Sequence, residues 1–144
     1  MAADPYQLWR FVDAQRGTID RAIAELRDGR KKTHWMWFVF PQLAGLGRSP
    51  NAQFFALGSL AEAASYLSHP DLGARLGDAL EAILAWSGRR TADEILGPID
   101  ATKLLSSLTL FDAVAPNGRF ADALAAFYGG ERDQQTLALL DDKR

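Results

Sequence analysis

The sequence has no cysteine, only two histidines and two methionines, and no apolar run near the roughly 18 residues of a membrane-spanning helix. The lack of cysteine excludes a disulfide framework, a thiolate metal site and a cysteine nucleophile. Sixteen Lys and Arg against 18 Asp and Glu leave a formal net charge of -2, so whole-molecule charge gives no bias toward nucleic acid or anionic membrane. Charged side chains interrupt the first 20 residues, which excludes an apolar signal-peptide core there and predicts a cytoplasmic protein.

Helical periodicity is present along most of the 144 residues, of which 48% are hydrophobic. A chain of this length fits one domain that can bury a core without a metal or a disulfide. Apolar residues recur at helical spacing, while strand alternation is absent over any useful length. We therefore predict an all-α fold, a single compact multihelical domain over residues 1–144 with about seven or eight short helices. Residues 1–5 and 141–144 are expected to be frayed ends.

Several helix boundaries can be predicted from capping and breaking residues. The segment 19–28 has apolar residues at i, i+3, i+4 and i+7, with charged residues between them, and Gly29 ends it. Ser59 and Thr91 each precede a glutamate by three residues, which is the capping-box spacing. The pair His69-Pro70 breaks one helix and starts another, because a residue before proline is pushed out of the α region.

The run Trp35–Phe40 is ambiguous, because six apolar residues before Pro41 fit either a buried strand or a buried helix. The neighbouring segments are helical and no comparable second strand exists to pair with the run, so we predict a short buried helix. The following segment, 42–51, contains Gly45, Gly47 and Pro50 and is predicted to be a loop.

Candidate binding residues are densest around this aromatic run. Cations, glycines that admit backbone N–H groups to an anion, and polar donors together predict a site for a phosphate-bearing small molecule. The candidates in this stretch are Arg30, Lys31, Gln42, Gly45, Gly47, Arg48 and Ser49. The alternatives are a solvated helix end for the cations and a tight connection for the glycines.

Trp35, Trp37 and His34 complete the candidates in this stretch. Residues i and i+2 point roughly 200° apart on a helix, so one tryptophan would pack inward while the other faces a groove, where it can stack on a ligand. The alternative is that both are core residues. His34 is the candidate acid or base, because an imidazole can exchange a proton near neutral pH, and its alternative is a capping or packing role.

A second polar group follows at Asp100, Lys103 and Ser107, which share one face of a predicted helix. These residues either line a ligand site or serve the helix itself, with Asp100 as its cap and an Asp–Lys pair at i, i+3. No metal or cofactor is predicted, since the two histidines lie in distant segments without a second ligand at helical spacing.

The run from Gly29 to Gln42 through His-Trp-Met-Trp-Phe-Val-Phe-Pro-Gln, the Gly-Leu-Gly-Arg-Ser loop and the Ser-Ser-Leu-Thr-Leu-Phe segment at 106–111 resemble a known family. It is the bacterial family numbered eighteen-ten among the domains of unknown function, whose members sometimes carry the label calpastatin. The resemblance covers roughly residues 9–140 and implies a mainly helical single domain, without implying any catalytic residues. The calpastatin label suits a disordered inhibitor, whereas this chain is patterned for a core.

Two functional hypotheses follow from these residues. The first is a protein that binds a nucleotide- or ADP-ribose-like ligand at the Arg30–Ser49 stretch. If it is an enzyme, it hydrolyses a glycosidic bond of that ligand. The second is a non-catalytic interaction domain in which the aromatic run is core or a partner hot spot. Convergence of His34, Gln42, Arg48 and Lys103 on one concave surface favours the first hypothesis, and an exposed apolar patch favours the second.

Overall fold

The computed structural model describes residues 3–142, and this part of the chain contains ten helices and no strand. The helices are α1 (Trp9–Gln15), α2 (Ile19–Arg27), α3 (Met36–Val39), α4 (Pro50–Phe54), α5 (Leu60–Ser68), α6 (Pro70–Leu84), α7 (Ala92–Leu96), α8 (Pro98–Val114), α9 (Arg119–Tyr128) and α10 (Gln134–Asp142). The all-α prediction is confirmed. Of the termini expected to fray, residues 1–2 and 143–144 lie outside the described residues, and α10 continues through Asp142. No helix within residues 3–142 combines the length and hydropathy that crossing a membrane requires.

The predicted number of helices was too low, and α4 accounts for one that was not expected. Pro50 lies within the predicted loop, yet it occupies the first turn of α4, where a missing N–H costs nothing. The Ser49 hydroxyl accepts a hydrogen bond from the Ala52 N–H at 3.1 Å and caps the helix. The Ser-Pro pair is therefore a helix start, although the glycines before it are typical of a loop.

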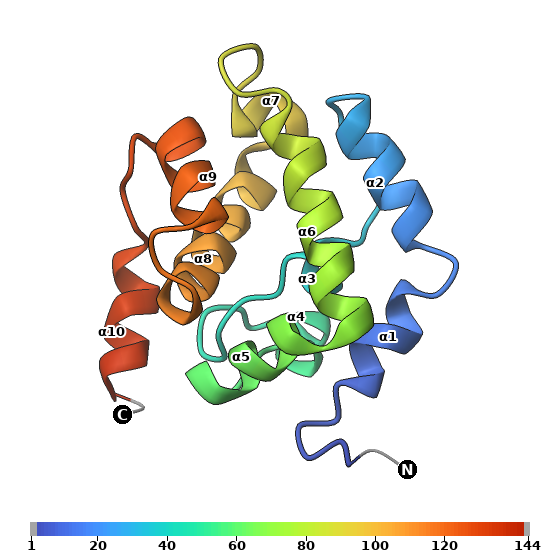
Figure 1. Cartoon of the computed structure of the whole chain (residues 1–144), viewed down its shortest axis with the longest axis vertical. Coiled ribbons are helices and arrows are strands. Elements are labelled where there is room, and N and C mark those ends of the chain that lie inside the picture. The colour runs from blue at the N-terminus through green and yellow to red at the C-terminus, as the bar shows by residue number, and fades with distance from the viewer. Residues whose placement is uncertain (1–2, 143–144) are drawn as a thin grey trace.

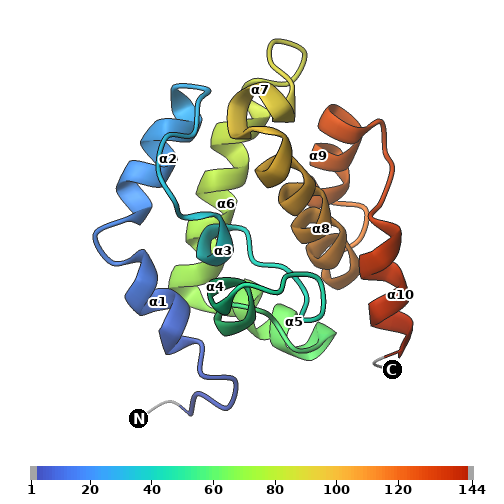
Figure 2. The same cartoon turned by 180° about the vertical axis from the view of Figure 1, so that it is seen from behind.

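The two longest helices, α6 and α8, organise the arrangement of the others (Figures 1 and 2). Helix α6 packs against α2 and α5, and α8 packs against α5, α7, α9 and α10. Helices α1 and α2 lie on one side of the molecule, while α9 and α10 lie on the other. The short α3 contacts both α1 and α6, which brings the aromatic run into the middle of the fold.

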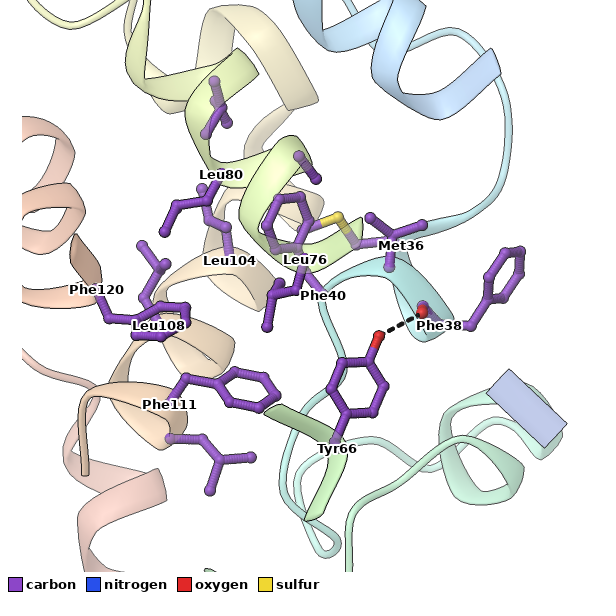
Figure 3. Packing of buried hydrophobic residues seen from close by; sticks show 14 of the residues in the cluster. Met36, Phe38, Phe40, Tyr66, Leu76, Leu80, Leu104, Leu108, Phe111 and Phe120 are labelled. Atoms are coloured by element: carbon purple, nitrogen blue, oxygen red, sulfur yellow. Dashed lines mark hydrogen bonds between the residues drawn. The ribbon is translucent and has the colours of Figure 1, made fainter. Parts of the chain in front are cut away.

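Most of the aromatic run is core, and the predicted short helix is confirmed as α3; Figure 3 shows Met36, Phe38 and Phe40 of this run among the buried side chains. Met36 and Phe40 are at most 2% exposed and lie among leucines of α6 and α8, including Leu76 and Leu104. Trp35 is fully buried, whereas Trp37 is only partly covered, so the two tryptophans do differ in their surroundings. The helix ends at Val39 because Pro41 follows Phe40.

The last turn of α3 is held by two buried polar side chains. The amide of Gln15 and the hydroxyl of Tyr66 both donate to the carbonyl oxygen of Phe38, at 2.7 and 3.1 Å. Figure 3 shows the bond from Tyr66, which lies against Phe111. A helix as short as α3 leaves its final carbonyls without partners inside the helix, and these two donors satisfy one of them.

The capping boxes predicted at Ser59 and Thr91 have different outcomes. Thr91 and Glu94 form a complete box, because the hydroxyl accepts from the Glu94 N–H and the carboxylate accepts from the Thr91 N–H. Ser59 also caps its helix, by accepting from the Glu62 N–H. The Glu62 carboxylate, however, accepts from the Gly58 N–H and pairs with Arg10 at 2.7 Å. At this helix the glutamate half of the capping box is therefore replaced by the bond from Gly58 and the ion pair with Arg10.

Helix α2 ends at Arg27, and the predicted helix-ending residue Gly29 lies just beyond the C-cap with a left-handed φ of 72°. The Arg30 N–H donates to the carbonyl of Glu25 and the Gly29 N–H donates to the carbonyl of Leu26, which is the Schellman arrangement. A side chain at Gly29 would also place its Cβ 2.7 Å from the Trp86 ring. The chain therefore turns sharply after α2 and runs back toward the core.

The carboxylate of Glu25 organises the turn that follows α2. It accepts hydrogen bonds from the N–H groups of Lys32 and Thr33 at 2.7 and 3.0 Å, from the Thr33 hydroxyl at 2.6 Å and from the Trp35 indole at 3.0 Å. Glu25 is 7% exposed, although its position between apolar residues of a predicted amphipathic helix made it look like a surface residue. Burial raises the pKa of Glu25, but the four donors outweigh that effect and lower the pKa from 4.5 to about 2.

We predict that Glu25→Gln destabilises the fold by about 3 kcal/mol at neutral pH, because each unit of pKa shift corresponds to about 1.4 kcal/mol. A pKa that is lowered on folding stabilises the protein fully above the unfolded-state pKa, and this stabilisation is lost as the pH falls through the folded-state pKa. The difference in the free energy of unfolding between wild type and Glu25→Gln should therefore shrink between pH 5 and pH 2, near the two pKa values of 4.5 and about 2.

Urea unfolding of both proteins across this pH range measures that difference. Glu81→Gln on the exposed face of α6 is the matched control and should change the free energy of unfolding by no more than about 0.5 kcal/mol. A Glu25→Gln protein with wild-type stability at pH 7 would contradict the role assigned to the carboxylate.

Candidate functional site

Asp100 joins two lysines that are far apart in sequence. Its carboxylate lies 2.8 Å from the Lys31 ammonium and 3.6 Å from the Lys103 ammonium. The Lys31 side chain is 8% exposed and the Lys103 side chain 27%, so the tighter pair is also the more buried one. The expectation that Asp100 caps its helix is wrong, because α8 begins at Pro98 with Gly97 at the N-cap position.

Each of the two lysines also lies over a tryptophan ring. The Lys31 ammonium is 5.2 Å from the centroid of Trp35, and the Lys103 ammonium is 5.3 Å from that of Trp37. Both distances fall within the range of cation–π attraction. Five of the sequence candidates therefore form one connected group, which we call the lysine–tryptophan cluster: Lys31, Trp35, Trp37, Asp100 and Lys103.

Beside this cluster lies a cleft of about 330 Å³, which we call the α8–α10 cleft. It is built from three segments: the loop between α3 and α4, the N-terminal half of α8 and the start of α10. Its lining residues are Gln42, Leu46, Gly47, Ile99, Thr102, Lys103, Ser106, Asp133 and Gln135. Three of the sequence candidates, Gln42, Gly47 and Lys103, thus meet in one concave surface.

Backbone pairing holds the loop wall of the cleft in place. The Leu57 N–H donates to the carbonyl of Gln42 at 2.9 Å, and the Ala44 N–H donates to the carbonyl of Leu57 at 2.8 Å. This short parallel bridge fixes Gln42 at the mouth of the loop, which Figures 1 and 2 show extending from α3 toward α8 and α10.

The loop glycines have packing reasons of their own. Gly45 has a φ of 104°, a conformation that other residues rarely adopt, and a Cβ there would lie 3.3 Å from Leu139 of α10. A Cβ at Gly47 would lie 2.4 Å from the Cβ of Ala52. Close chain approach therefore gives both glycines a packing role, and their role in binding an anion stays a prediction.

Several other sequence candidates lie outside the cleft lining. Arg30, His34 and Arg48 are exposed, and His34 makes no hydrogen bond or ion pair with another described residue. Ser49 is occupied as the cap of α4. Ser107 is fully buried, and its hydroxyl has no hydrogen-bond partner among residues 3–142.

Asp133 is a cleft residue that sequence reasoning missed. Its Oδ2 accepts from the Ser106 hydroxyl at 3.2 Å, from the Thr136 N–H at 3.0 Å and from the Thr136 hydroxyl. The Asp133 N–H in turn donates to the hydroxyl of Thr109 at 3.0 Å. The available signal was the spacing Asp-x-x-Thr before the last helix, which is typical of an N-cap.

The described residues contain no group of three or more His, Asp or Glu side chains placed to hold a metal ion. The titratable groups that line the α8–α10 cleft are Lys103 and Asp133. The cleft therefore offers one cation, one carboxylate, two amides and two hydroxyls, a set suited to hydrogen bonding with a polar ligand.

Two comparisons identify relatives of this fold. A family model described as "Protein of unknown function (DUF1810)" matches residues 5–140. The crystal structure of the conserved hypothetical protein Rv1873 from Mycobacterium tuberculosis is 48% identical and has a TM-score of 0.92. The match covers 96% of this chain and 99% of that one. No curated protein shows significant similarity to the chain.

We predict that Asp100→Asn lowers the free energy of unfolding by about 3 kcal/mol, because it leaves the buried Lys31 ammonium without a countercharge. Lys103→Met should cost no more than about 1 kcal/mol, since its ion pair is longer and more exposed. Chemical denaturation of the two variants, with the exposed Lys32→Met as control, measures both effects. A larger loss for Lys103→Met than for Asp100→Asn would contradict this ranking.

Proposed function

The chain belongs to the DUF1810 family, whose description assigns no activity, and we propose that it binds a small phosphate-bearing ligand of nucleotide or ADP-ribose type in the α8–α10 cleft. The observation that carries the proposal is the convergence of Gln42, Gly47 and Lys103 from segments about 60 residues apart. Binding sites commonly combine an apolar surface with a few convergent polar groups, and this cleft has both.

Lys103 is the residue that would meet the phosphate. Its ammonium lies 3.6 Å from Asp100, which already has a closer partner in Lys31 at 2.8 Å. Two cations thus share one carboxylate, and the more exposed of them lines the cleft. A phosphate oxygen offers this ammonium a stronger, charge-assisted hydrogen bond than the long contact it makes with Asp100.

Two further features of the lining support a ligand of this type. Gln42 supplies an amide that can donate and accept, which suits a base edge or a ribose. Ile99 is 73% exposed at the start of α8 and gives the cleft an apolar flank. His34, the sequence candidate for acid or base, lies outside the lining, so the proposal concerns binding and includes no hydrolytic step.

We predict that AMP or ADP-ribose raises the melting temperature of the protein and that Lys103→Ala weakens the binding at least tenfold. A charge-assisted hydrogen bond contributes about 1.5–3 kcal/mol, and 1.4 kcal/mol corresponds to a factor of ten in Kd. Ligand at 100 times its Kd should stabilise the wild type by about 2.7 kcal/mol, a shift of roughly 9 °C in the melting temperature of a domain of this length. Isothermal titration calorimetry then gives the Kd of each variant.

Lys32→Ala is the matched control, because this lysine is exposed on the same stretch and does not line the cleft. It should bind like the wild type, and so should His34→Ala. The proposal fails if AMP, ADP-ribose and NAD all leave the melting temperature unchanged at millimolar concentration. It also fails if Lys32→Ala weakens binding as much as Lys103→Ala does.

A second candidate function, a non-catalytic interaction domain, is favoured by one observation. Trp9 is 56% exposed and lines a groove of about 690 Å³ between α1 and the junction of α5 and α6. An exposed tryptophan in a groove is typical of a partner hot spot, and here it would receive an apolar segment of a protein partner. The discriminating pair is Trp9→Ser and Phe54→Ser, because Phe54 is similarly exposed, at 53%, but lies outside the groove. Only the first should abolish partner binding.

A further inference from the structure

We infer that the moiety recognised in the α8–α10 cleft is a sugar phosphate, with Lys103 on the phosphate and Asp133 on the sugar hydroxyls. This inference rests on the proposed function and narrows it from phosphate-bearing ligands in general to those that also carry sugar hydroxyls. It depends on two observations: Lys103 and Asp133 line the same cleft, and one oxygen of the Asp133 carboxylate has no hydrogen-bond partner among residues 3–142.

Asp133 has one oxygen occupied and one unused. Its Oδ2 accepts all three hydrogen bonds from Ser106 and Thr136, while its Oδ1 makes none with residues 3–142. The carboxylate is held rigidly by these donors at the start of α10, and the residue lines the cleft. An ionised carboxylate oxygen accepts hydrogen bonds and cannot donate, so its natural ligand partner is a hydroxyl or another donor.

Lys103 and Asp133 line the same cleft from α8 and from the start of α10, two neighbouring helices. Lys103 lies three residues before Ser106 on α8, a spacing that puts the two Cβ atoms about 5–6 Å apart on one face. The Ser106 hydroxyl is 3.2 Å from the Asp133 carboxylate. The cleft therefore contains a cation on α8 and an anion at the start of α10, and its lining side chains carry no excess of either charge.

A ligand that satisfies both groups must be anionic at one end and rich in hydroxyl donors at the other. A ribose 5-phosphate unit has this chemistry, either as a free sugar phosphate or as part of a nucleotide. The amides of Gln42 and Gln135 line the same cleft and can donate to or accept from the remaining hydroxyls. The cleft volume of about 330 Å³ is at the small end for ligand sites and suits this unit better than a complete dinucleotide.

Asp133→Asn is the decisive variant. The asparagine side chain keeps an oxygen for Ser106 and Thr136, and asparagine is a good N-cap, so α10 should remain intact. In this variant the NH₂ group, a hydrogen-bond donor, would take the place of the unused Oδ1, and the side chain would lose its negative charge. Calorimetry with four probes, namely inorganic phosphate, ribose 5-phosphate, 2-deoxyribose 5-phosphate and AMP, separates recognition of the phosphate from recognition of the hydroxyls.

The expected result is that wild type binds ribose 5-phosphate at least tenfold more tightly than inorganic phosphate. Asp133→Asn should remove this difference while leaving the Kd for phosphate unchanged, and Lys103→Ala should weaken binding of all four probes. AMP binding without ribose 5-phosphate binding would mean that the base is the recognised part, and it would overturn the inference while the proposed function stands.

Two other outcomes are equally decisive. Equal binding of phosphate and ribose 5-phosphate by the wild type, or an unaltered preference in Asp133→Asn, would overturn the sugar assignment alone. Absence of binding by every probe, in a wild-type protein that unfolds cooperatively, would overturn both the sugar assignment and the proposed function. Circular dichroism of Asp133→Asn at 222 nm verifies that the helices are retained.

Discussion

The buried carboxylate of Glu25 is the interaction on which the arrangement of the rest depends. Four donors from the segment 32–35 converge on it, and they turn the chain from the end of α2 toward the core. This turn places Lys31 beside Asp100 of α8 and Trp35 in the interior. The Glu25 hydrogen bonds therefore hold the segment that follows Lys31, and the Lys31 side chain contacts the helix that carries the candidate site.

The helical architecture could be predicted from the sequence because its signals are local. The glycine after α2, the Thr91 capping box and the His69-Pro70 break are each decided by a few neighbouring residues, and each appears in the structure. Glu25 could not be predicted in this way, since its partners are set by the path of a loop. Helix α4 was missed because glycines beside Ser49 made the whole segment look irregular.

In the candidate site, too, features set by neighbouring residues could be predicted from the sequence, whereas contacts between distant segments could not. Lys103 was predicted from the polar face of its helix and Gln42 from its position beside the glycine loop, and the fold brings both to one cleft. Gly45 and Gly47 were predicted either to admit an anion or to form a tight connection, and their close contacts with Leu139 and Ala52 fit the second interpretation. Asp133 was overlooked because a cap residue before a terminal helix has no visible link to a lysine 30 residues earlier.

The Glu25 carboxylate has a consequence for local opening of the chain. Backbone amides in a loop ordinarily exchange their hydrogens with solvent rapidly, because few of them are bonded. The amides of Lys32 and Thr33 are bonded to a buried charge, so their exchange requires the carboxylate to lose its partners. These two loop amides should therefore exchange as slowly as those of the surrounding helices, which would extend the slow-exchanging core to a segment without regular secondary structure.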